Sequence, residues 1–208
     1  MIASDNSQSH VRASEVIRRG GVIAFRTDTF YGLGGDPLNQ AAVQKICELK
    51  GREGANPILL LISDLSQVAR FIIQTSEVFK TVSGRFWPGP LTLVGAARPE
   101  LAIGLTAGTG TIGVRLPDDK TVCALVRACG GALTGTSANL SGEPPARTAA
   151  EVRDYFPAGV DLIVDGGEVT ATRPSTVLDL SGSEPRLIRE GAITRDALQD
   201  FFQSTRKD

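Results

Sequence analysis

A short apolar run near the start of the chain limits its fold more than any other feature. Residues 22–25 read Val-Ile-Ala-Phe and follow two glycines, a pattern that predicts a buried strand. The strand leads into Thr27, Asp28 and Thr29 and then into a glycine-rich loop. A buried strand fixes the residues that follow it, and glycine allows the backbone to approach a ligand closely. We therefore expect a binding site that uses these hydroxyl groups where the strand ends.

A cationic turn follows the next predicted helix. The apolar pattern after Asn39 predicts an N-capped helix, which ends near Lys50 and Arg52, and Asn56 then leads into an apolar strand over residues 58–62. Two cations two residues apart on a turn, with an amide four residues later, suit phosphate oxygens and a purine or ribose edge. The same cations also suit an ordinary helix C-terminus, where the helix dipole favours Lys and Arg. This stretch alone leaves both interpretations open.

Polar residues follow several later predicted strands in the same way. Arg115 lies near the end of the strand of residues 111–116, and small hydroxyl and amide residues fill positions 134–142 after another strand. Ser175 and Arg189 belong to two further strand ends. Because these polar residues recur where strands meet loops, we interpret them together as the lining of one cavity.

Each of these features also has an ordinary explanation. A run such as residues 134–142 is typical of a polar turn. Arg115 suits a surface ion pair with Asp118 or Asp119, whereas a buried guanidinium at that position needs a carboxylate or a ligand.

The order of the predicted elements indicates an α/β fold. Strand and helix patterns alternate in the first half of the chain, and strand patterns cluster later. We predict a single domain with a twisted mixed sheet, flanked by helices, around a concave cavity. At 208 residues the chain is long enough to bury a full core in one domain. We assign residues 9–208 to this domain and the polar residues 1–8 to a disordered N-terminal tail.

Charge and cysteine content restrict the class of protein. The chain has 22 basic and 23 acidic residues, so it lacks the basic character of a protein that clamps duplex nucleic acid. Cys47, Cys123 and Cys129 fit neither a zinc motif nor a disulfide framework, which favours a reducing compartment. The N-terminus lacks the apolar segment of a signal peptide, and no apolar run reaches membrane-spanning length. We expect a cytoplasmic protein without a membrane partner.

The histidine content excludes two kinds of catalytic site. His10 is the one histidine of the sequence, and it lies close to the polar N-terminus. This makes a Ser-His-Asp or Cys-His nucleophile and an imidazole-based metal site very poor hypotheses. Any chemistry has to rely on cations, hydroxyls, carboxylates and a metal that arrives with a ligand, so no metal site formed by the protein itself is expected.

The ordered set of motifs gives the chain a family resemblance. It is similar to the YrdC-like L-threonylcarbamoyladenylate synthase family over residues 11–197, through these segments: TDTFYGLG, KGR with Asn56-Pro57, WPGPLT, IGVRLP, TSANLSGEPP, PSTV and LIREG. The resemblance implies the YrdC-like fold, with a deep cavity lined by cations. It also implies a reaction in which L-threonine, bicarbonate and ATP give threonylcarbamoyl-AMP and pyrophosphate. The product serves N6-threonylcarbamoylation of adenosine 37 in tRNAs that read codons beginning with A.

The resemblance implies a role for each matching residue. For substrate threonine the matching residues are Thr29, Arg115 and Ser175. For ATP they are Lys50, Arg52, Asn56, Thr111, Ser137, Asn139 and Arg189. Lys50 and Arg52 are the expected catalytic pair, since they would stabilise the charge that develops on the phosphates. Mg²⁺ is expected to be carried with ATP, the downstream partners are tRNA threonylcarbamoyl transferase proteins, and a local contact with tRNA remains open.

Two positions depart from the family pattern. Arg26 replaces the usual proline before the Thr-Asp-Thr loop, which alters the rigidity of the loop and brings an extra cation near the cavity. Leu61 replaces a histidine that many members carry. If Leu61 faces the cavity, a polar contact to threonine is lost; if Leu61 belongs to the core, the exchange has no bearing on the ligand.

Two other functions remain as alternatives. One is a carbamoyl-adenylate-forming relative with a different substrate, although such proteins usually contain the domain within much longer chains than these 208 residues, which are closer to the short, single-domain form. The other is an RNA-binding module for tRNA or double-stranded RNA. The low aromatic content (5%) and the net charge of −1 argue against stacking platforms and basic stripes.

Overall fold

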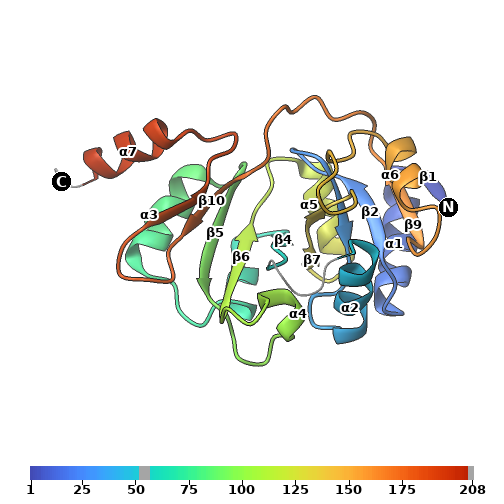
Figure 1. Cartoon of the computed structure of the whole chain (residues 1–208), viewed down its shortest axis with the longest axis horizontal. Coiled ribbons are helices and arrows are strands. Elements are labelled where there is room, and N and C mark those ends of the chain that lie inside the picture. The colour runs from blue at the N-terminus through green and yellow to red at the C-terminus, as the bar shows by residue number, and fades with distance from the viewer. Residues whose placement is uncertain (52–56, 206–208) are drawn as a thin grey trace.

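Two mixed β-sheets with helices packed against them make up residues 1–51 and 57–205, the part of the chain that the computed structural model describes (Figure 1). The strands are β1 (Ile2–Ser4), β2 (Ile23–Arg26), β3 (Tyr31–Gly34), β4 (Leu60–Ile62), β5 (Leu91–Ala96), β6 (Thr111–Arg115), β7 (Ala132–Thr134), β8 (Thr136–Ser137), β9 (Leu162–Asp165), β10 (Thr176–Asp179) and β11 (Arg186–Arg189). The helices are α1 (Ser7–Arg18), α2 (Gln40–Leu49), the 3₁₀-helix η1 (Leu65–Arg70), α3 (Glu77–Phe86), α4 (Ile103–Thr106), α5 (Lys120–Ala128), α6 (Ala149–Tyr155) and α7 (Arg195–Ser204).

The first sheet has the order β1-β9-β2-β3-β8. Its centre is β2, which pairs in parallel with β9 and in antiparallel with β3. Residues 23–25 of β2 are fully buried, because the sheet is covered on both faces. The hairpin between β2 and β3 places the Thr27–Phe30 loop at the edge that faces the second sheet.

The second sheet has the order β11-β10-β5-β6-β4-β7 and is also mixed. The pair β5 and β6 is antiparallel, with Leu93 opposite Val114, so the register carries Thr92 and Arg115 to the same end of the pair. A long connection from β9 to β10 crosses from the first sheet to the second, above the space between them (Figure 1).

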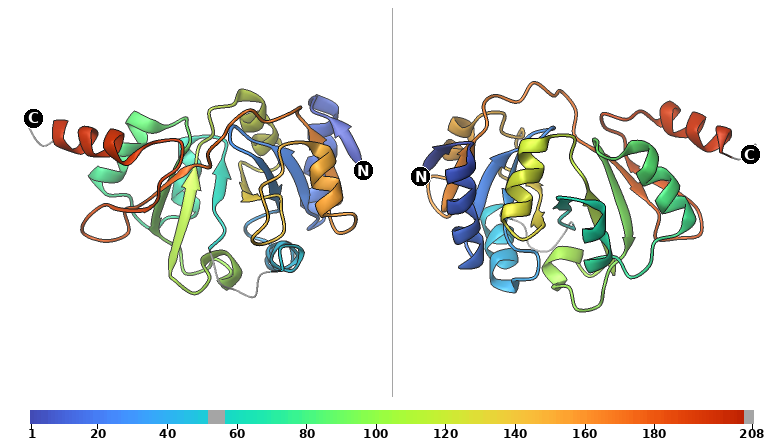
Figure 2. Two further views of the ribbon diagram at one scale, coloured as in Figure 1. Left: turned by 45° about the horizontal axis from the view of Figure 1, so that its top comes forward. Right: turned by 180° about the vertical axis from the view of Figure 1, so that it is seen from behind.

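Helices α1 and α5 lie side by side and tie the two sheets together. Helix α1 packs on β9 and β2, and α5 packs on β4 and β7 (Figure 2, right). The apolar stripe of α5 contributes Val122, Leu125 and Val126 to a core cluster that also contains Phe25 and Leu133. A larger cluster fills the rest of the interior between the sheets and the other helices.

The mixed α/β class is confirmed, with the strands divided over two sheets. Helix α3 covers Glu77–Phe86, and the side chains of Thr148 and Thr194 cap α6 and α7. Strand β3 and helix α4 were not predicted. Glycine-rich sequence over residues 31–35 hides the strand, and α4 is only one turn long.

The expectation of a disordered tail at residues 1–8 is wrong. Strand β1 pairs in parallel with β9, and the Asn6 side chain accepts hydrogen bonds from the backbone of Gln8 and Ser9 to cap α1. The His10 ring contacts the carboxylate of Asp5. The polar residues of this segment are therefore cap and pairing groups of the fold.

No helix among residues 1–51 and 57–205 is long and apolar enough to cross a membrane.

Candidate active site

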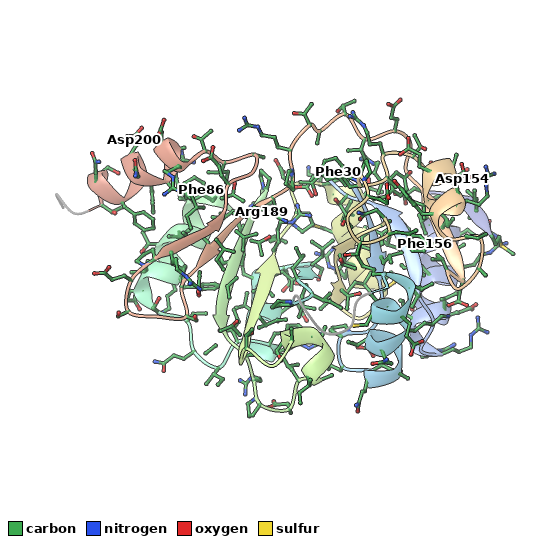
Figure 3. All side chains as sticks on the ribbon, in the orientation of Figure 1. Phe30, Phe86, Asp154, Phe156, Arg189 and Asp200 are labelled. Atoms are coloured by element: carbon green, nitrogen blue, oxygen red, sulfur yellow. The ribbon has the colours of Figure 1, made fainter. Side chains whose placement is uncertain are left out.

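A cavity of about 770 Å³ lies between the two sheets and is lined by residues from both of them. Phe30 and Arg189, labelled in Figure 3, contribute to its lining from the β2–β3 loop and from β11. The predicted shared cavity is confirmed for these site residues: Thr29, Thr111, Arg115, Ser137, Asn139, Ser175 and Arg189. The expected ATP residues Arg52 and Asn56 lie outside the described part of the chain.

The Thr-Asp-Thr loop is organised by the first threonine. The Thr27 hydroxyl oxygen accepts from the backbone N–H groups of Thr29 (3.1 Å) and Phe30 (3.2 Å). The Thr27 side chain is nearly inaccessible, so this turn is fixed by buried hydrogen bonds. The turn holds the Thr29 hydroxyl 3.4 Å from Nη2 of Arg115.

Arg115 is the buried cation of the site. Its side chain is 4% exposed, and Nη1 donates to Oδ1 of Asp28 in a close ion pair. Its Nε–H is buried and has no acceptor within residues 1–51 and 57–205. A buried guanidinium with one carboxylate and an unused donor suits an anionic ligand.

The alternative of a surface ion pair for Arg115 is therefore wrong. Asp119, one of the two aspartates considered, instead caps α5 through the N–H groups of Thr121 and Val122. The same carboxylate pairs with Arg26. This pairing leaves Arg26 outside the lining that the structure describes, so the extra cation does not lie in the cavity.

Arg189, on β11, and Ser175, directly before β10, line the cavity from the same sheet as Arg115. The Arg189 guanidinium donates to the carbonyl of Ser175 (2.9 Å) and to its hydroxyl (3.3 Å), and that hydroxyl is 3.0 Å from the hydroxyl of Thr92. Partial burial and the positive charge of Arg115 lower the pKa of Arg189 below its ordinary value. Two mutually repelling guanidinium groups thus border the cavity, which favours an anion between them.

Thr92 is a lining residue that the sequence analysis missed. It is 1% exposed and lies within β5, where the neighbouring residues are apolar. A threonine inside an otherwise apolar strand, directly after the turn of the WPGPLT motif, was the available signal.

Lys50 holds the loop that contains Ser137 and Asn139. Its side chain is almost fully buried, and its ammonium group donates to the Ser137 carbonyl, to the Asn139 carbonyl (2.9 Å) and to the Asn139 side-chain oxygen (3.2 Å). The Asn139 amide in turn donates to the carbonyls of Leu140 (2.9 Å) and Glu143 (2.5 Å). This bonding fits the expectation that Asn139 orders the loop.

Leu61 does not face the cavity. It is 0% exposed and belongs to the core cluster that includes Phe25 and Leu133, beneath Gly135. Leu59, two residues earlier on the same side of the strand, lines the cavity instead. The hypothesis that Leu61 removes a contact to the ligand is wrong, and the core alternative applies.

The donor set of the cavity suits anions. Guanidinium groups, hydroxyls and amides line it, and Glu143 adds a carboxylate. Within the described ranges, no three His, Cys, Asp or Glu side chains are grouped so that they could hold a metal ion. Carboxylate and phosphate groups are the ligands that such a lining would bind.

Comparison with known proteins agrees with this picture. A family model described as telomere recombination, covering Sua5, YciO and YrdC proteins, matches residues 15–191. The chain is 39% identical to a threonylcarbamoyl-AMP synthase of Bacillus subtilis over 94% of this chain and 57% of the relative. It is 42% identical to a threonylcarbamoyl-AMP synthase of Thiobacillus denitrificans over 79% of this chain and 87% of the relative. The crystal structure of P. abyssi Sua5 complexed with L-threonine superimposes with a TM-score of 0.90 at 32% identity, covering 97% of this chain and 59% of that chain.

Fold and cavity thus define a two-sheet α/β protein with a cavity whose lining suits anionic ligands. The chain belongs to the Sua5/YciO/YrdC family. It spans a little more than half of the length of the Bacillus subtilis relative.

Proposed function

We propose that the chain is an L-threonylcarbamoyladenylate synthase, a nucleotidyltransferase that supplies threonylcarbamoyl-AMP for the t⁶A37 modification of tRNA. In the balanced reaction, the amine of L-threonine and bicarbonate combine to a carbamate and water. A carbamate oxygen then attacks the α-phosphorus of ATP, and the bond to the β-phosphate oxygen breaks to release pyrophosphate.

The observation that carries this proposal is the state of Arg115. Its buried guanidinium is held by Asp28 and next to the Thr29 hydroxyl, and its Nε–H has no acceptor among the described residues. A carboxylate from an amino acid fits such a cation, since Arg binds carboxylates through paired N–H groups. The name of the P. abyssi structure, which states that Sua5 is complexed with L-threonine, supports this choice of amino acid.

The roles in nucleotide binding follow from the rest of the lining. Arg189, Thr111 and the Ser137–Asn139 loop would contact ATP, and Lys50 and Arg52 would provide the positive charge for the departing pyrophosphate. The names of the two synthase relatives support ATP as the donor. Because the carbamate oxygen is already a nucleophile, this step needs no histidine base.

A magnesium ion fits this cavity as part of a nucleotide complex. The part of the lining that the structure describes offers one carboxylate, Glu143, so the phosphate oxygens of ATP would hold most of the ion's coordination sphere. When bound, Mg²⁺ would neutralise part of the phosphate charge. We further infer a cytoplasmic location and delivery of the product to tRNA threonylcarbamoyl transferase proteins, with any tRNA contact confined to a local surface.

The decisive experiment measures ATP-dependent pyrophosphate release by the purified protein with and without L-threonine and bicarbonate, with the adenylate product identified by mass spectrometry. The proposal expects release that requires both co-substrates. Release with another amine in place of threonine would identify a carbamoyl-adenylate relative of different specificity. RNA affinity that falls steeply with salt, without any stabilisation of the fold by ATP or threonine, would favour an RNA-binding module.

A further inference from the structure

Arg115 and Asp28 form a buried ion pair next to the cavity. Arg115 lines the cavity, whereas Asp28 is not part of the lining that the structure describes. Thr27 and Thr29 both line the cavity, whereas Asp28 between them points to Arg115. The side chains of Asp28 and Arg115 are 12% and 4% exposed, so the pair is shielded from solvent. Taking both charges out of water is costly, and such a pair needs a reason other than stability.

The contacts of Arg115 are unequal along its guanidinium. Nη1 is bound by the Asp28 carboxylate, Nη2 has only a long contact of 3.4 Å to the Thr29 hydroxyl, and Nε–H has no acceptor within the described ranges. A guanidinium binds a carboxylate through two N–H groups on one edge. With Nη1 engaged, the edge formed by Nε and Nη2 retains the unused donors.

The loop geometry fixes Asp28 in turn. The Thr27 hydroxyl accepts the N–H groups of Thr29 and Phe30, so the backbone on the C-terminal side of Asp28 cannot turn freely. Arg115 and Arg189 both line the cavity, and the positive charge of Arg115 lowers the pKa of Arg189. Without the carboxylate of Asp28, the repulsion between Arg115 and Arg189 would not be offset, and the Arg115 guanidinium would lose its orientation.

We propose that Asp28 is a positioning residue, which binds Nη1 of Arg115 so that Nε and Nη2 face the carboxylate of the amino-acid substrate. This inference rests on the proposed function, because it names the residue that orients the amino-acid site. Asp28 itself does not touch the substrate, and its effect passes through Arg115.

The alternative role of Asp28 predicts the opposite result. If Asp28 were only a negative charge close to the site, it would repel the substrate carboxylate and compete with it for Arg115. Removing that charge would then tighten the binding of L-threonine. The sign of the change in affinity therefore separates positioning from competition.

The test is calorimetric titration of the full-length protein with L-threonine, alongside ATP titration and melting curves. Asp28→Ala is expected to raise the Kd for L-threonine about 10- to 100-fold, the size of a lost hydrogen bond to a charged group, and to leave the Kd for ATP within about twofold. Asp28→Asn keeps the size and one acceptor oxygen, so we expect a smaller rise, about 3- to 10-fold. If Asp28→Ala is poorly folded, the Kd of Asp28→Asn for L-threonine decides the test.

The matched control is Asp119→Asn. It neutralises the carboxylate that pairs with Arg26, the residue directly before the same loop, and an asparagine side chain can still cap α5. We expect threonine affinity within about twofold of the wild type, since this ion pair lies away from the described lining of the cavity.

A double variant shows whether Asp28 acts through Arg115. The Arg115→Lys variant retains a positive charge but lacks the paired N–H groups of a guanidinium, which Asp28 could orient. In an Arg115→Lys background, Asp28→Ala is therefore expected to change the threonine Kd by less than about threefold. An equal loss in both backgrounds, or threonine binding that is unchanged or tighter in Asp28→Ala, would overturn the inference. A wild-type protein that does not bind L-threonine would instead overturn the proposed function, and the inference with it.

Discussion

Lys50 and Arg115 are two buried cations that are held in different ways: Arg115 lines the cavity, whereas Lys50 lies behind the described lining and binds Ser137 and Asn139, which belong to it. The Lys50 ammonium group donates to two backbone carbonyls and a side-chain amide of the Ser137–Asn139 loop. The Arg115 guanidinium is paired with a carboxylate and keeps an Nε–H without an acceptor among the described residues. The first cation is engaged by the protein's own loop, and the second still has a donor to offer.

This difference indicates separate roles for Lys50 and Arg115, although both are cations at the end of a predicted helix or strand. Lys50 joins the end of α2 to a loop more than eighty residues further along, so part of its role is to hold the cavity wall. Among the residues that the structure describes, the Arg115 side chain forms hydrogen bonds with Asp28 and Thr29 alone. We therefore expect substitutions of Lys50 to lower both stability and turnover, and substitutions around Arg115 to change mainly the affinity for the ligand.

The largest effect is expected for Lys50→Met, which keeps the apolar stem and removes the charge. Pyrophosphate release should fall on the order of 100-fold, because both the loop and the positive charge near the phosphates are lost. The fold should also lose about 3 kcal/mol, since buried carbonyls are left without their donor. For a chain of this size that corresponds to a fall in Tm of about 6–12 °C.

Lys45→Met on the same helix is the control for this variant. Lys45 pairs with Asp161 while about a third of its side chain remains exposed, so we expect a change below about 1 kcal/mol and normal turnover. If Lys50→Met lost activity without any fall in Tm, the contrast between the two buried cations would disappear, and Lys50 would act on the phosphates alone.

The second effect concerns Leu61, which lies opposite Arg115 in the register of β4 and β6. Leu61→His places an imidazole in a fully buried apolar cluster, at an expected cost of about 2–4 kcal/mol, and gives no gain in threonine affinity. Leu59→His is the matched variant, because Leu59 lines the cavity and is only partly buried. Tighter threonine binding by Leu61→His would show that the site next to Arg115 extends into the core.

Much of the fold could be read from local patterns because those patterns report burial directly. Residues 22–25 are apolar because β2 is covered on both faces, and Asp64, Thr148 and Thr194 cap helices because their side chains replace missing backbone partners. Polar residues at strand ends also located the cavity. These are properties of single segments, which the sequence displays without knowledge of the tertiary structure.

The errors arose where distant segments meet. Whether Leu61 faces the cavity depends on how Gly135 closes over it, and whether Arg115 pairs with Asp28 or with a neighbouring aspartate depends on the hairpin of β2 and β3. The N-terminal residues look like a tail because their pairing partner, β9, lies about 160 residues away. The periodicity of apolar residues does not show which distant segments pair with one another.

The third effect is expected at Arg189, the second guanidinium of the cavity. Arg189→Ala should raise the KM for ATP about tenfold, as expected for one lost charge-assisted contact at a partly exposed position. Stability should change by about 1 kcal/mol or less, because the side chain is only partly buried. Arg186→Ala on the same strand is the control, since Arg186 is 75% exposed and pairs with Asp179. Equal KM values for ATP in Arg189→Ala and Arg186→Ala would show that Arg189 does not contribute to ATP binding. Arg115 would then be the guanidinium of the described lining that binds ligands.

The smallest effect is expected far from both cations, at His10. Its ring contacts Asp5, and the two side chains are 12% and 14% exposed. His10→Ala should lower stability by about 1 kcal/mol, the usual net value of one hydrogen bond, and Asp5→Ala should do the same, because each variant removes the same contact. Kinetic constants for L-threonine and ATP should stay at their wild-type values, measured by pyrophosphate release beside melting curves. A loss of turnover without a loss of stability would mean that the N-terminal segment reaches the cavity. His10 would then belong to the ligand-binding groups and not to those that only support the fold.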